Sequence, residues 1–471
     1  MAIKQPDPSR RPAPNALADV LSKLAARFGN RYSANETIRQ QHGHTLTWTP
    51  NQPPDAVVWP HSTEEVQEIV RLCASARVPV IPYGTGTSLE GHVNAPLGGV
   101  CIDVSQMKRI IAVHTEDLDC VVEPGVTRKE LNEYLRDQGL FFPIDPGADA
   151  SLGGMASTRA SGTNAVRYGT MKDNVIALAA VAASGELIRT AGRAKKTSAG
   201  YDLTRLFVGA EGTLGIITEL TLRLQGIPES ISGGICPFPD VKSACDAVIM
   251  TIQTGLPVAR IELLDRLQVQ AVNAYSKLDL PDTPLLMVEF HGTEAGVAEQ
   301  SRRFGEIAGE CGGGPFGWTT KPEDRTKLWQ ARHDVYWASC ALAPGKKAFS
   351  TDVCVPISRL AECVEETRRD IDATGLLAPM VGHVGDGNFH LIVLLDPEDP
   401  SELAKVEDFL ERLVRRALSM EGTCTGEHGI GQAKQKYLDE ELGGGALKAM
   451  RAIKQAMDPL GIMNPGKLGE V

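Results

Sequence analysis

Two histidines flank a glycine-containing turn in the segment His383-Val-Gly-Asp-Gly-Asn-Phe-His390, and a carboxylate and another histidine follow at Glu427 and His428. Asp386-Gly387 is typical of a two-residue hairpin turn, because both central positions of a type I′ turn need positive φ. His383 precedes this pair by three residues and His390 follows it by three, which predicts that the two histidines are cross-strand partners. Their Cβ atoms would then lie roughly 4.5–5.5 Å apart on one face of the hairpin.

Two imidazoles at this separation can share one divalent metal. A carboxylate such as Glu427 would complete a set of two histidines and one carboxylate, which leaves coordination positions open for catalysis. The glycines in Gly426-Glu427-His428-Gly429 allow the backbone to turn tightly there. We therefore predict a metal site formed by His383, His390 and Glu427. The alternative is a surface hairpin with two unrelated histidines, and the motif alone leaves that alternative open.

Composition and charge narrow the class of protein. With 471 residues the chain exceeds what one hydrophobic core usually organises, so we expect two or three domains. The net charge of −11 and the pI near 5.5 argue against nucleic acid as the main partner. No apolar run approaches the ~20 residues of a membrane-spanning helix, and residues 1–15 lack a signal-peptide core. Ten scattered cysteines without a Cys-x-x-Cys pair favour reduced thiols in a cytoplasmic setting.

Helices and strands alternate through the N-terminal half of the chain. Ser62-x-x-Glu65 and Thr127-x-x-Glu130 have the form of capping boxes and predict helices that begin there, the second running to about Gln138. The first motif is followed by apolar residues at helical spacing. These patterns, with a short strand predicted at 78–82, indicate an α+β domain.

From Ile231 the pattern changes and indicates a second α+β domain. Predicted helices at 241–254 and 295–311 alternate there with predicted strands at 258–264 and 284–291. Glycine runs at 312–314 and 443–445 are expected to be loops. A final helix is predicted from about 446 to 458, ending at Asp458-Pro459.

A glycine-rich loop follows the strand at 78–82 and imitates a nicotinamide-dinucleotide motif. Gly84-x-Gly86 is followed by Asp103, nineteen residues after Gly84. The next glycine, Gly91, comes too late for that motif, and the glycines and proline of 89–99 leave no room for a helix before the next strand. A parallel crossover usually needs such a helix. The sequence therefore excludes a Rossmann unit here.

Two further clusters of glycine and small residues, at 146–154 with 161–164 and at 211–217, accompany the loop at 84–88. A loop of this kind can offer backbone N–H groups to a phosphate without a helix behind it. One such cluster would ordinarily be a turn. Three in one domain, each beside apolar strands, predict a backbone that closes around a long, flat, phosphorylated ligand.

A set of distinctive motifs runs from about residue 50 to the C-terminus. They are Pro-Tyr-Gly-Thr-Gly-Thr-Ser at 82–88, Pro-Gly-Ala-Asp-Ala-Ser-Leu-Gly-Gly at 146–154, Gly-Ala-Glu-Gly-Thr-Leu-Gly-Ile-Ile-Thr-Glu at 209–219, His-Val-Gly-Asp-Gly-Asn-Phe-His at 383–390, Gly-Glu-His-Gly-Ile-Gly at 426–431 and Asn-Pro-Gly-Lys at 464–467. In these motifs the sequence resembles the FAD-linked D-2-hydroxyacid dehydrogenases of the vanillyl-alcohol-oxidase/PCMH flavoprotein superfamily. Two further motifs, Thr351-Asp-Val-Cys-Val-Pro-Ile-Ser358 and Thr423-Cys-Thr-Gly-Glu-His428, place it nearest the D-lactate dehydrogenase (cytochrome) branch.

This resemblance implies an α+β architecture with a PCMH-type FAD-binding domain. It implies an N-terminal extension over 1–49, the FAD-binding domain over 50–226, a substrate or cap domain with the metal site over 227–430, and a C-terminal helical segment over 431–471 that packs on the FAD domain.

The cofactors implied are non-covalent FAD and one divalent metal, zinc or manganese, held by His383, His390 and Glu427. His92 could be read as a covalent flavin attachment, but it lies beyond Gly91, outside the phosphate loop, and we expect an exposed loop histidine. The residues implied to contact FAD are Pro82, Tyr83, Gly84, Thr85, Gly86, Thr87, Ser88, Pro146, Gly147, Ala148, Asp149, Ser151, Leu152, Gly153, Gly154, Ser157, Ser161, Gly162, Asn164, Glu211, Gly212, Gly215, Ile216, Ile217 and Asn464.

The resemblance also implies catalytic roles. His428 would be the general base, Arg332 would grip the substrate carboxylate, and Lys347 would lie near the flavin and substrate. An ordinary surface ion pair at the start of a helix is the alternative for Arg332. Relatives that act on D-2-hydroxyglutarate carry asparagine two residues after the second metal histidine, where this sequence has Ile392. Because Ile392 would pack against an alkyl end of the substrate, a short apolar D-2-hydroxyacid is favoured over a dicarboxylate.

The predicted reaction oxidises a small D-2-hydroxyacid, D-lactate above all, to the 2-oxoacid, with hydride passing to flavin N5. The electrons would leave to an external cytochrome, quinone or electron-transfer flavoprotein, because no haem or iron–sulfur ligand pattern is present. The protein is expected to be cytoplasmic and to meet this acceptor at the inner membrane face. A glycolate oxidase subunit and a D-2-hydroxyglutarate dehydrogenase are the nearest alternatives. A flavin-free metal hydrolase is an alternative of another class. The preferred hydroxyacid, metal, acceptor and oligomeric state stay open.

Overall fold

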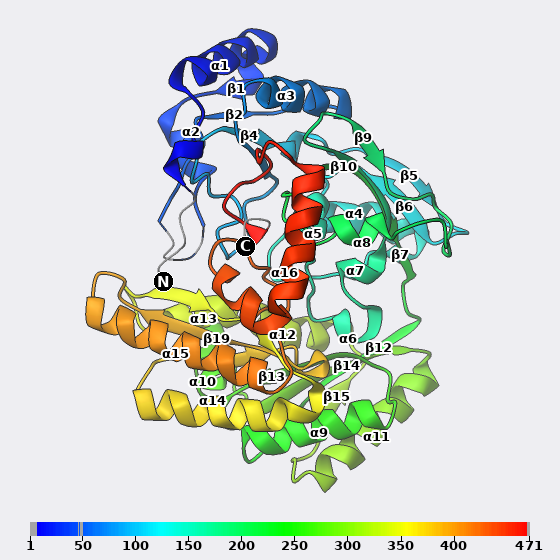
Figure 1. Cartoon of the computed structure of the whole chain (residues 1–471). Helices are drawn as coiled ribbons and strands as arrows, with labels where there is room; N and C mark the ends of the chain where they lie inside the picture. Colours follow the sequence, from blue (N-terminus) through cyan, green and yellow to red (C-terminus); the bar gives the residue numbers. More distant parts are fainter. Residues whose placement is uncertain (1–6, 46, 48–49, 469–471) are drawn as a thin grey trace. The chain divides into compact units, whose positions relative to one another are not determined.

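Strands at 56–58, 80–83 and 100–103 form the parallel core of the first sheet in the computed structural model, which describes residues 7–45, 47 and 50–468 (Figure 1). The chain divides into two units. Unit 1 takes its described residues from 1–161, 170–226 and 427–471, and unit 2 takes 162–169 and 227–426. The division after residue 226 coincides with the predicted boundary. The second division follows residue 426, whereas the sequence predicted it after 430, and the transfer of 162–169 to unit 2 was not predicted.

Unit 1 is built on two sheets. The first has the order β1-β2-β4-β3, and the second is antiparallel with the order β5-β6-β10-β8-β9. A pair of short strands, β7 and β11, completes it. The strands are β1 (Tyr32–Ser33), β2 (Ala56–Val58), β3 (Val80–Tyr83), β4 (Val100–Asp103), β5 (Ile110–His114), β6 (Asp119–Val122), β7 (Leu140–Phe141), β8 (Val175–Val181), β9 (Leu187–Arg189), β10 (Ile216–Arg223) and β11 (Gln225–Gly226).

The helices of unit 1 begin largely where the sequence predicts. Ser62 Oγ accepts the N–H of Glu65 at the start of α3, and both halves of the Thr127–Glu130 capping box are formed at α4, which ends at Leu135 and continues as a 3-10 turn to Gln138. The helices are α1 (Pro14–Phe28), α2 (Glu36–Gln41), α3 (Thr63–Ser75), α4 (Arg128–Leu135), α5 (Leu152–Thr158), α7 (Met171–Asn174), α8 (Leu203–Phe207) and α16 (Leu438–Met457).

Two details of unit 1 differ from the sequence-based expectation. The glycines at 443–445 were expected to form a loop, but helix α16 runs through them with one break, at Gly443 (φ 76°). The predicted extension over 1–49 is not separate in its described part. Val20 and Leu24 of α1 share an apolar cluster with Val58 and Ile69. Residues 1–6, 46 and 48–49 of that extension, and 469–471 of the predicted C-terminal segment, lie outside the described residues.

The crossover between β3 and β4 confirms the exclusion of a Rossmann unit. The two strands are parallel neighbours, but residues 84–99 join them without any helix. Apolar residues at both ends of the loop are buried, including Val80 and Val100. The chain therefore makes a parallel connection with an irregular loop, and this loop carries the first glycine-rich motif.

Unit 2 is a three-layer arrangement around an eight-stranded sheet with the order β15-β12-β14-β13-β18-β19-β16, and β17 pairs with β19. Its strands are β12 (Ser230–Pro237), β13 (Val258–Leu264), β14 (Leu285–Gly292), β15 (Gly317–Thr319), β16 (Lys347–Ser350), β17 (Val353–Cys354), β18 (Met380–Gly382) and β19 (Asn388–Leu395). Its helices are α6 (Ala165–Tyr168), α9 (Val241–Gln253), α10 (Arg266–Ser276), α11 (Glu294–Glu310), α12 (Pro322–His333), α13 (Val335–Ala341), α14 (Leu360–Thr374) and α15 (Pro400–Ser419).

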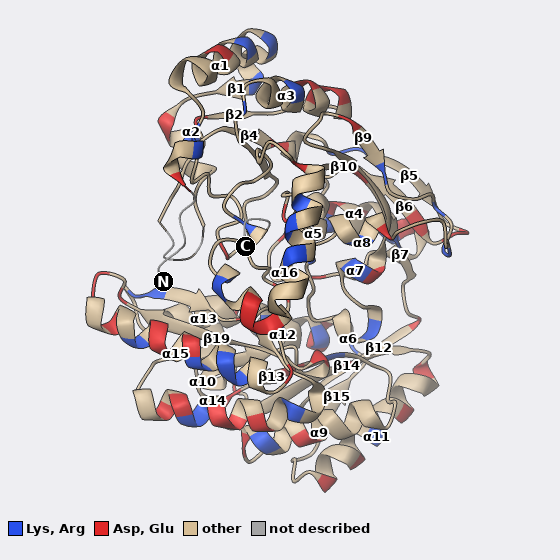
Figure 2. Ribbon diagram, viewed as in Figure 1, with Lys and Arg blue, Asp and Glu red and all other residues tan. Residues whose placement is uncertain are grey.

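Helices cover both faces of this sheet. On one face, Trp329 of α12, Val335 of α13 and Val272 of α10 pack against Met287 and Leu394. On the other face, Ser232 of β12 bonds Ser301 of α11, and α9, α14 and α15 complete the layer. Figure 2 shows that basic and acidic residues are interspersed along α14 and α15. Arg412 of α15 pairs with Asp370 of α14 at 2.7 Å.

Among the described residues, no helix combines the length and apolar character needed to cross a membrane. None of the ten cysteines, all of which lie within the described residues, forms a disulfide, and seven of them are buried.

Candidate active site

The turn between β18 and β19 differs from the predicted type I′ hairpin. His390 pairs with Val381 rather than with His383, and residues 384–386 form a 3-10 turn. Only Gly387 has the positive φ, of 79°, that the prediction required of both Asp386 and Gly387. The prediction of the turn type and of direct cross-strand pairing was therefore wrong, because Asp386 keeps an ordinary helical conformation and lengthens the turn.

The two imidazoles nevertheless lie together. The register differs from the predicted one by two residues, and an even shift leaves each side chain on its original face because the side-chain period of a strand is two. The ring centroids of His383 and His390 are 5.3 Å apart, with the ring planes nearly perpendicular. Both residues are buried, at 9% and 5% exposure. The alternative of a surface hairpin with unrelated histidines is thereby removed.

Each imidazole is oriented through its Nδ1 atom. His383 Nδ1–H donates to a carboxylate oxygen of Glu262 at 2.8 Å, and His390 Nδ1–H donates to the carbonyl of Thr351 at 2.8 Å. A carboxylate and a carbonyl can only accept, so the proton resides on Nδ1 in both rings. This tautomer places the lone pair on Nε2, which is the arrangement that metal-ligating histidines usually have.

Glu427 supplies the carboxylate of the set. One ligand atom from each of His383, His390 and Glu427 lies within 4.8 Å of the other two. Glu427 is joined by a peptide bond to Gly426 of unit 2, which packs so closely on the start of β19 that an added Cβ would lie 2.3 Å from Asn388 Nδ2. Thr425 Oγ1 fixes the same segment by donating to Asp352 at 2.7 Å. Two imidazole nitrogens and one carboxylate suit zinc, manganese or iron, so the donor set fits a divalent metal.

Arg332 reaches this group from the last turn of α12. Its Nε–H donates to Glu262 Oε2 at 2.8 Å, and Glu262 is fully buried in the centre of β13. Burial by itself would raise the pKa of Glu262, but His383 and Arg332 outweigh it, so the pKa lies below its usual value. The alternative of an exposed surface pair for Arg332 is therefore wrong, because its partner is a buried carboxylate.

A second buried carboxylate lies on the neighbouring strand β14. Glu289 accepts from His291 Nε2 at 2.8 Å and from Trp329 Nε1 at 2.5 Å, and Arg260 Nε lies 3.6 Å from it. His291 Nδ1 bonds the Tyr168 hydroxyl at 2.7 Å, which attaches segment 162–169 to the sheet. Neither Glu262 nor Glu289 was among the predicted site residues. Their signal is a charged residue at alternate positions inside an otherwise apolar strand, which marks one polar sheet face.

Ile392 lies on the same sheet face as His390, two residues further along β19, and packs in an apolar cluster with Ala348 and Val381. Lys347 was predicted beside the substrate. It pairs with Leu395, whose side chain projects from the opposite face, and it is exposed. The structure therefore brings His383, His390, Arg332 and Ile392 to one face of the sheet and does not bring Lys347 there.

The glycine-rich clusters of unit 1 pack on one another. A Cβ on Gly84 would lie 2.2 Å from Ser151 Oγ, and one on Gly212 would lie 2.3 Å from Pro82 Cγ. Gly86 and Gly212 both have left-handed backbone, with φ of 68° and 73°. Side chains at these glycines would block the approach of the loops. The loops at 84–88, 146–154 and 211–217, which were predicted to wrap one ligand, therefore lie next to one another in unit 1. Gly162 and Asn164, which were predicted to belong to the second cluster, are part of unit 2.

Asn464 joins these loops from the segment after α16. Its Nδ2 donates to the carbonyls of Glu211 at 2.7 Å and of His92 at 3.2 Å. Within the part of the chain that the structure describes, the buried oxygens Ser88 Oγ, Ser151 Oγ and Asn464 Oδ1 have no protein hydrogen-bond partner. Buried polar atoms are normally satisfied, so these oxygens fit a polar ligand such as the phosphate and ribityl groups of FAD.

His428 lies beside a buried carboxylate of unit 1. Its Nδ1 is 3.6 Å from Glu90 Oε1, and Lys434 Nζ is 3.1 Å from the same oxygen. The backbone bends at 426–428, as predicted from the surrounding glycines. Glu211, predicted to contact FAD, has both carboxylate oxygens bonded to the N–H groups of residues 430 and 431, at 2.7 and 2.9 Å.

His92 was expected to be an exposed loop histidine, and this is wrong. The residue is 5% exposed, and its Nε2 lies 3.3 Å from Glu211 Oε1. The imidazole is buried because Gly429 and the C-terminal segment pack over the loop that follows Gly91.

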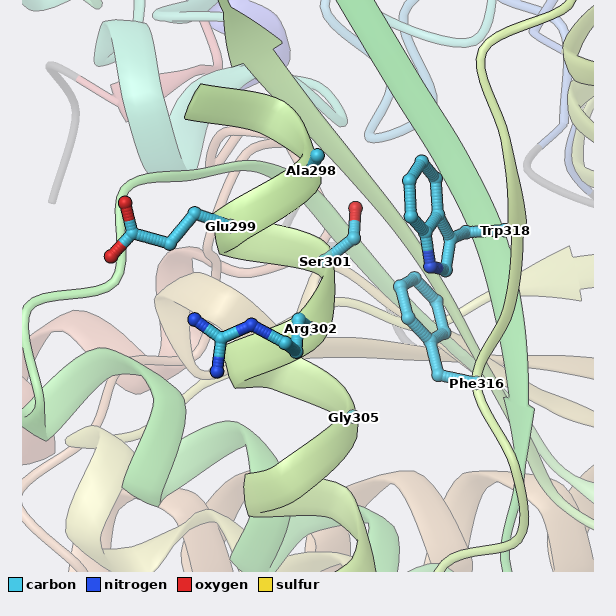
Figure 3. A pocket seen from close by; sticks show the side chains of 7 residues that line it. All are labelled: Ala298, Glu299, Ser301, Arg302, Gly305, Phe316 and Trp318. Atoms are coloured by element: carbon cyan, nitrogen blue, oxygen red, sulfur yellow. The ribbon is translucent and has the colours of Figure 1, made fainter. Parts of the chain in front are cut away.

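A separate hollow of about 700 Å³ lies between α11 and β15 of unit 2, where Phe316 and Trp318 face the helix (Figure 3). Arg302 and Glu299 line it from α11. No predicted site residue is among the seven that line it.

Comparisons with known proteins agree with this description. The family of FAD linked oxidases, C-terminal domain, matches residues 227–468, and the FAD binding domain family matches residues 54–191. The probable mitochondrial D-lactate dehydrogenase of Danio rerio is 52% identical over 460 residues, covering 97% of this chain and 93% of the relative. The mitochondrial D-lactate dehydrogenase (cytochrome) of Arabidopsis thaliana is 52% identical over 415 residues, covering 88% and 73%.

Among solved structures, p-cresol methylhydroxylase with substrate bound superposes with a TM-score of 0.80 at 18% identity and covers 97% of each chain. This likeness establishes a PCMH-type flavoprotein fold. The chain belongs to the FAD-linked oxidase family, as its motifs predicted. It is an FAD-linked oxidoreductase, and its membership of this family rules out the alternative of a flavin-free metal hydrolase.

Proposed function

We propose that this protein oxidises a small D-2-hydroxyacid, with D-lactate favoured, to the 2-oxoacid with the help of FAD and a divalent metal. The observation that carries the proposal is the group formed by the buried His383 and His390 and the partly buried Glu427, which Glu262 connects to Arg332. The names of two relatives at 52% identity, both D-lactate dehydrogenases, support the choice of substrate.

FAD would accept the hydride removed from C2, and the metal would polarise the substrate hydroxyl and carboxylate. Arg332 binds the substrate carboxylate. Its Nε is occupied by Glu262, so its two Nη groups form the planar fork that a carboxylate recognises. Lysine could not reproduce this geometry. The role predicted for Lys347 is not part of the proposal, because that side chain lies on the other sheet face.

His428 takes the proton of the substrate hydroxyl. Burial by itself would raise the pKa of Glu90, but Lys434 and His428 outweigh it, so the pKa is lowered and Glu90 is ionised near neutral pH. A carboxylate at 3.6 Å from Nδ1 favours a proton on that nitrogen, which leaves Nε2 as the acceptor. An imidazole is suited to general-base catalysis near pH 7.

Anaerobic stopped-flow measurement of flavin reduction tests the proposal. D-lactate should reduce the flavin faster than glycolate and D-2-hydroxyglutarate do, and L-lactate should be inactive. A chelator should abolish reduction while FAD stays bound, and Zn²⁺ or Mn²⁺ should restore it. Faster flavin reduction by glycolate or D-2-hydroxyglutarate would show that this acid, and not D-lactate, is the preferred substrate. Full activity of metal-free protein would disprove the metal role.

The electrons then leave to an external acceptor, which we propose to be a cytochrome or quinone. The bracketed word cytochrome in the name of the Arabidopsis thaliana relative supports this choice. Reoxidation of the substrate-reduced protein by ferricytochrome c, a soluble quinone, an electron-transfer flavoprotein and O₂ should be compared. Fastest reoxidation by O₂ would contradict an external protein or quinone acceptor.

A further inference from the structure

We propose that Glu262 is a positioning residue that sets the orientation of the metal ligand His383 and of the carboxylate-binding Arg332 at the same time. This inference rests on the proposed function. Glu262 carries no role in the sequence motifs. It lies in the middle of β13, two residues before Leu264, which pairs with Val381, and Val381 in turn pairs with His390. Glu262 is therefore on the sheet face that also holds His390.

One carboxylate serves two donors from different elements. Oε1 accepts from His383 Nδ1, in the turn after β18, and Oε2 accepts from Arg332 Nε, at the end of α12, both at 2.8 Å. Glu262 is 0% exposed, and the side chains of Arg332 and His383 are 14% and 10% exposed. A buried carboxylate is costly unless its oxygens are paired in this way, so the three side chains hold one another in place.

The two contacts have different chemical consequences. At His383 the carboxylate holds the proton on Nδ1, so that Nε2 presents its lone pair to the ligand set. At Arg332 it takes Nε and fixes the plane of the guanidinium, which determines where the Nη fork points. Because both contacts use the same rigid group, a displaced carboxylate would disturb the metal site and the substrate clamp together.

Glutamine at this position cannot satisfy both partners. Its side chain offers one acceptor oxygen and one N–H₂ donor group in place of two acceptors. If the oxygen stays with Arg332, the amide N–H₂ faces His383 and favours the tautomer with the proton on Nε2. That tautomer cannot coordinate through Nε2. Aspartate keeps the charge but is one methylene shorter, so it can reach one donor while losing contact with the other.

The chain offers a matched control on the next strand. Glu289 is also buried, at 3% exposure, and also interacts with a histidine and an arginine, His291 and Arg260. Neither partner belongs to the proposed metal site. Glu262→Gln and Glu289→Gln should therefore cost similar stability in thermal unfolding but should differ in metal binding.

The experiment compares purified wild type, Glu262→Gln, Glu262→Asp and Glu289→Gln, all loaded with FAD. Zn²⁺ and Mn²⁺ affinities are measured separately by competition with a chelator, and KM and kcat for D-lactate are measured at saturating metal. Glu262→Gln should weaken metal binding 10–100-fold, as is usual for the loss of an outer-shell partner. Its KM should rise by a larger factor than its kcat falls. Glu262→Asp should recover part of the metal affinity, and Glu289→Gln should keep it near wild type.

Metal affinity and KM of Glu262→Gln within twofold of wild type would overturn the inference. So would equal losses in both glutamine variants, which would show a structural role alone. If Glu262→Gln does not fold, Arg332→Lys tests the link from the other side: metal affinity should fall although residue 332 is not a ligand, and an unchanged affinity would refute the link. Wild-type protein that is fully active without metal would instead overturn the proposed metal role, and the metal affinities would still report on Glu262.

Discussion

His428 depends on its neighbours for the role proposed here, and its replacement by alanine isolates that role. His428→Ala should lower the rate of flavin reduction by D-lactate by roughly 10²–10⁴, the usual range for a lost acid–base group. FAD and metal content should stay near wild type, because the variant leaves Glu427 and the glycine-rich loops in place. Rapid-mixing absorbance at the flavin band measures the rate. An unchanged rate at saturating substrate would assign the base to another residue.

Ile392 has a packing role that the sequence did not indicate. It is 3% exposed among Ala348, Val381 and Leu394. Ile392→Asn would bury an amide among apolar side chains and should lower the free energy of unfolding by about 2–5 kcal/mol, whereas Ile392→Val should lower it by about 0.5–1.5 kcal/mol. Urea unfolding followed by circular dichroism measures both. A stable asparagine variant that had gained activity on D-2-hydroxyglutarate would show instead that the side chain reaches substrate.

At the level of elements, the start of α3 is held by an ion pair that should respond to pH. Arg31 donates to both carboxylate oxygens of Glu65, at 2.6 and 2.8 Å. This contact lowers the pKa of Glu65 to about 2, against about 4.3 in an unfolded chain. The stabilisation is therefore complete above about pH 4.3 and is lost as the pH falls toward 2.

The variant Glu65→Gln, which removes the charge of this ion pair, tests the predicted pH dependence. The difference in unfolding free energy between wild type and this variant should be constant from pH 7 to about pH 5 and should shrink steadily below pH 4.3. Urea titrations at half-unit steps of pH would show it. A difference that grew on acidification would contradict the depressed pKa. The exposed pair Lys242–Asp246 in unit 2, at 2.6 Å, offers a control through Asp246→Asn, whose effect should be smaller.

The elements themselves were largely predictable from the sequence, since caps and periodicity are local. β13 spans the predicted 258–264, and α3 begins after the predicted cap at Ser62. The turn after β18 was not predictable, because Asp386-Gly387 is also compatible with a 3-10 turn. A contact from a distant part of the sequence holds the observed turn, since the N–H of Val355 donates to the carbonyl of Gly387 at 3.0 Å. The proximity of His383 and His390 was still predicted correctly, because the observed strand register differs from the predicted one by two residues, an even number.

Glu262 and segment 162–169 could not be predicted for a different reason. A charge within an apolar strand has no meaning until the partner strands and helices are known, and Arg332 and His383 are 70 and 121 residues away from Glu262. Residues 162–169 lie within the flavin-domain sequence, and only long-range contacts such as Tyr168–His291 place them in unit 2.

At the scale of the whole molecule, the flavin is expected to be bound without a covalent link. Denaturation with acid should release about one FAD per chain into the supernatant, because the glycine-rich loops would hold it by hydrogen bonds and packing alone. His92, the histidine nearest those motifs, is buried against Glu211. Absorbance of the supernatant and the pellet measures the partition. A yellow pellet after washing would show a covalent bond and would point to His92.

Unit 1 is made of separate stretches of the chain, and this has a consequence for its folding during translation. Residues 1–161 and 170–226 emerge first, yet Asn464 and Lys454, which bond to the loops at 92 and 211–213, follow only after all of unit 2. At 5–20 residues per second, this wait lasts on the order of ten seconds to a minute. During that interval the loops of the nascent flavin domain lack the hydrogen bonds from Lys454 and Asn464. We therefore expect the cofactor site to be completed only when translation has passed residue 464.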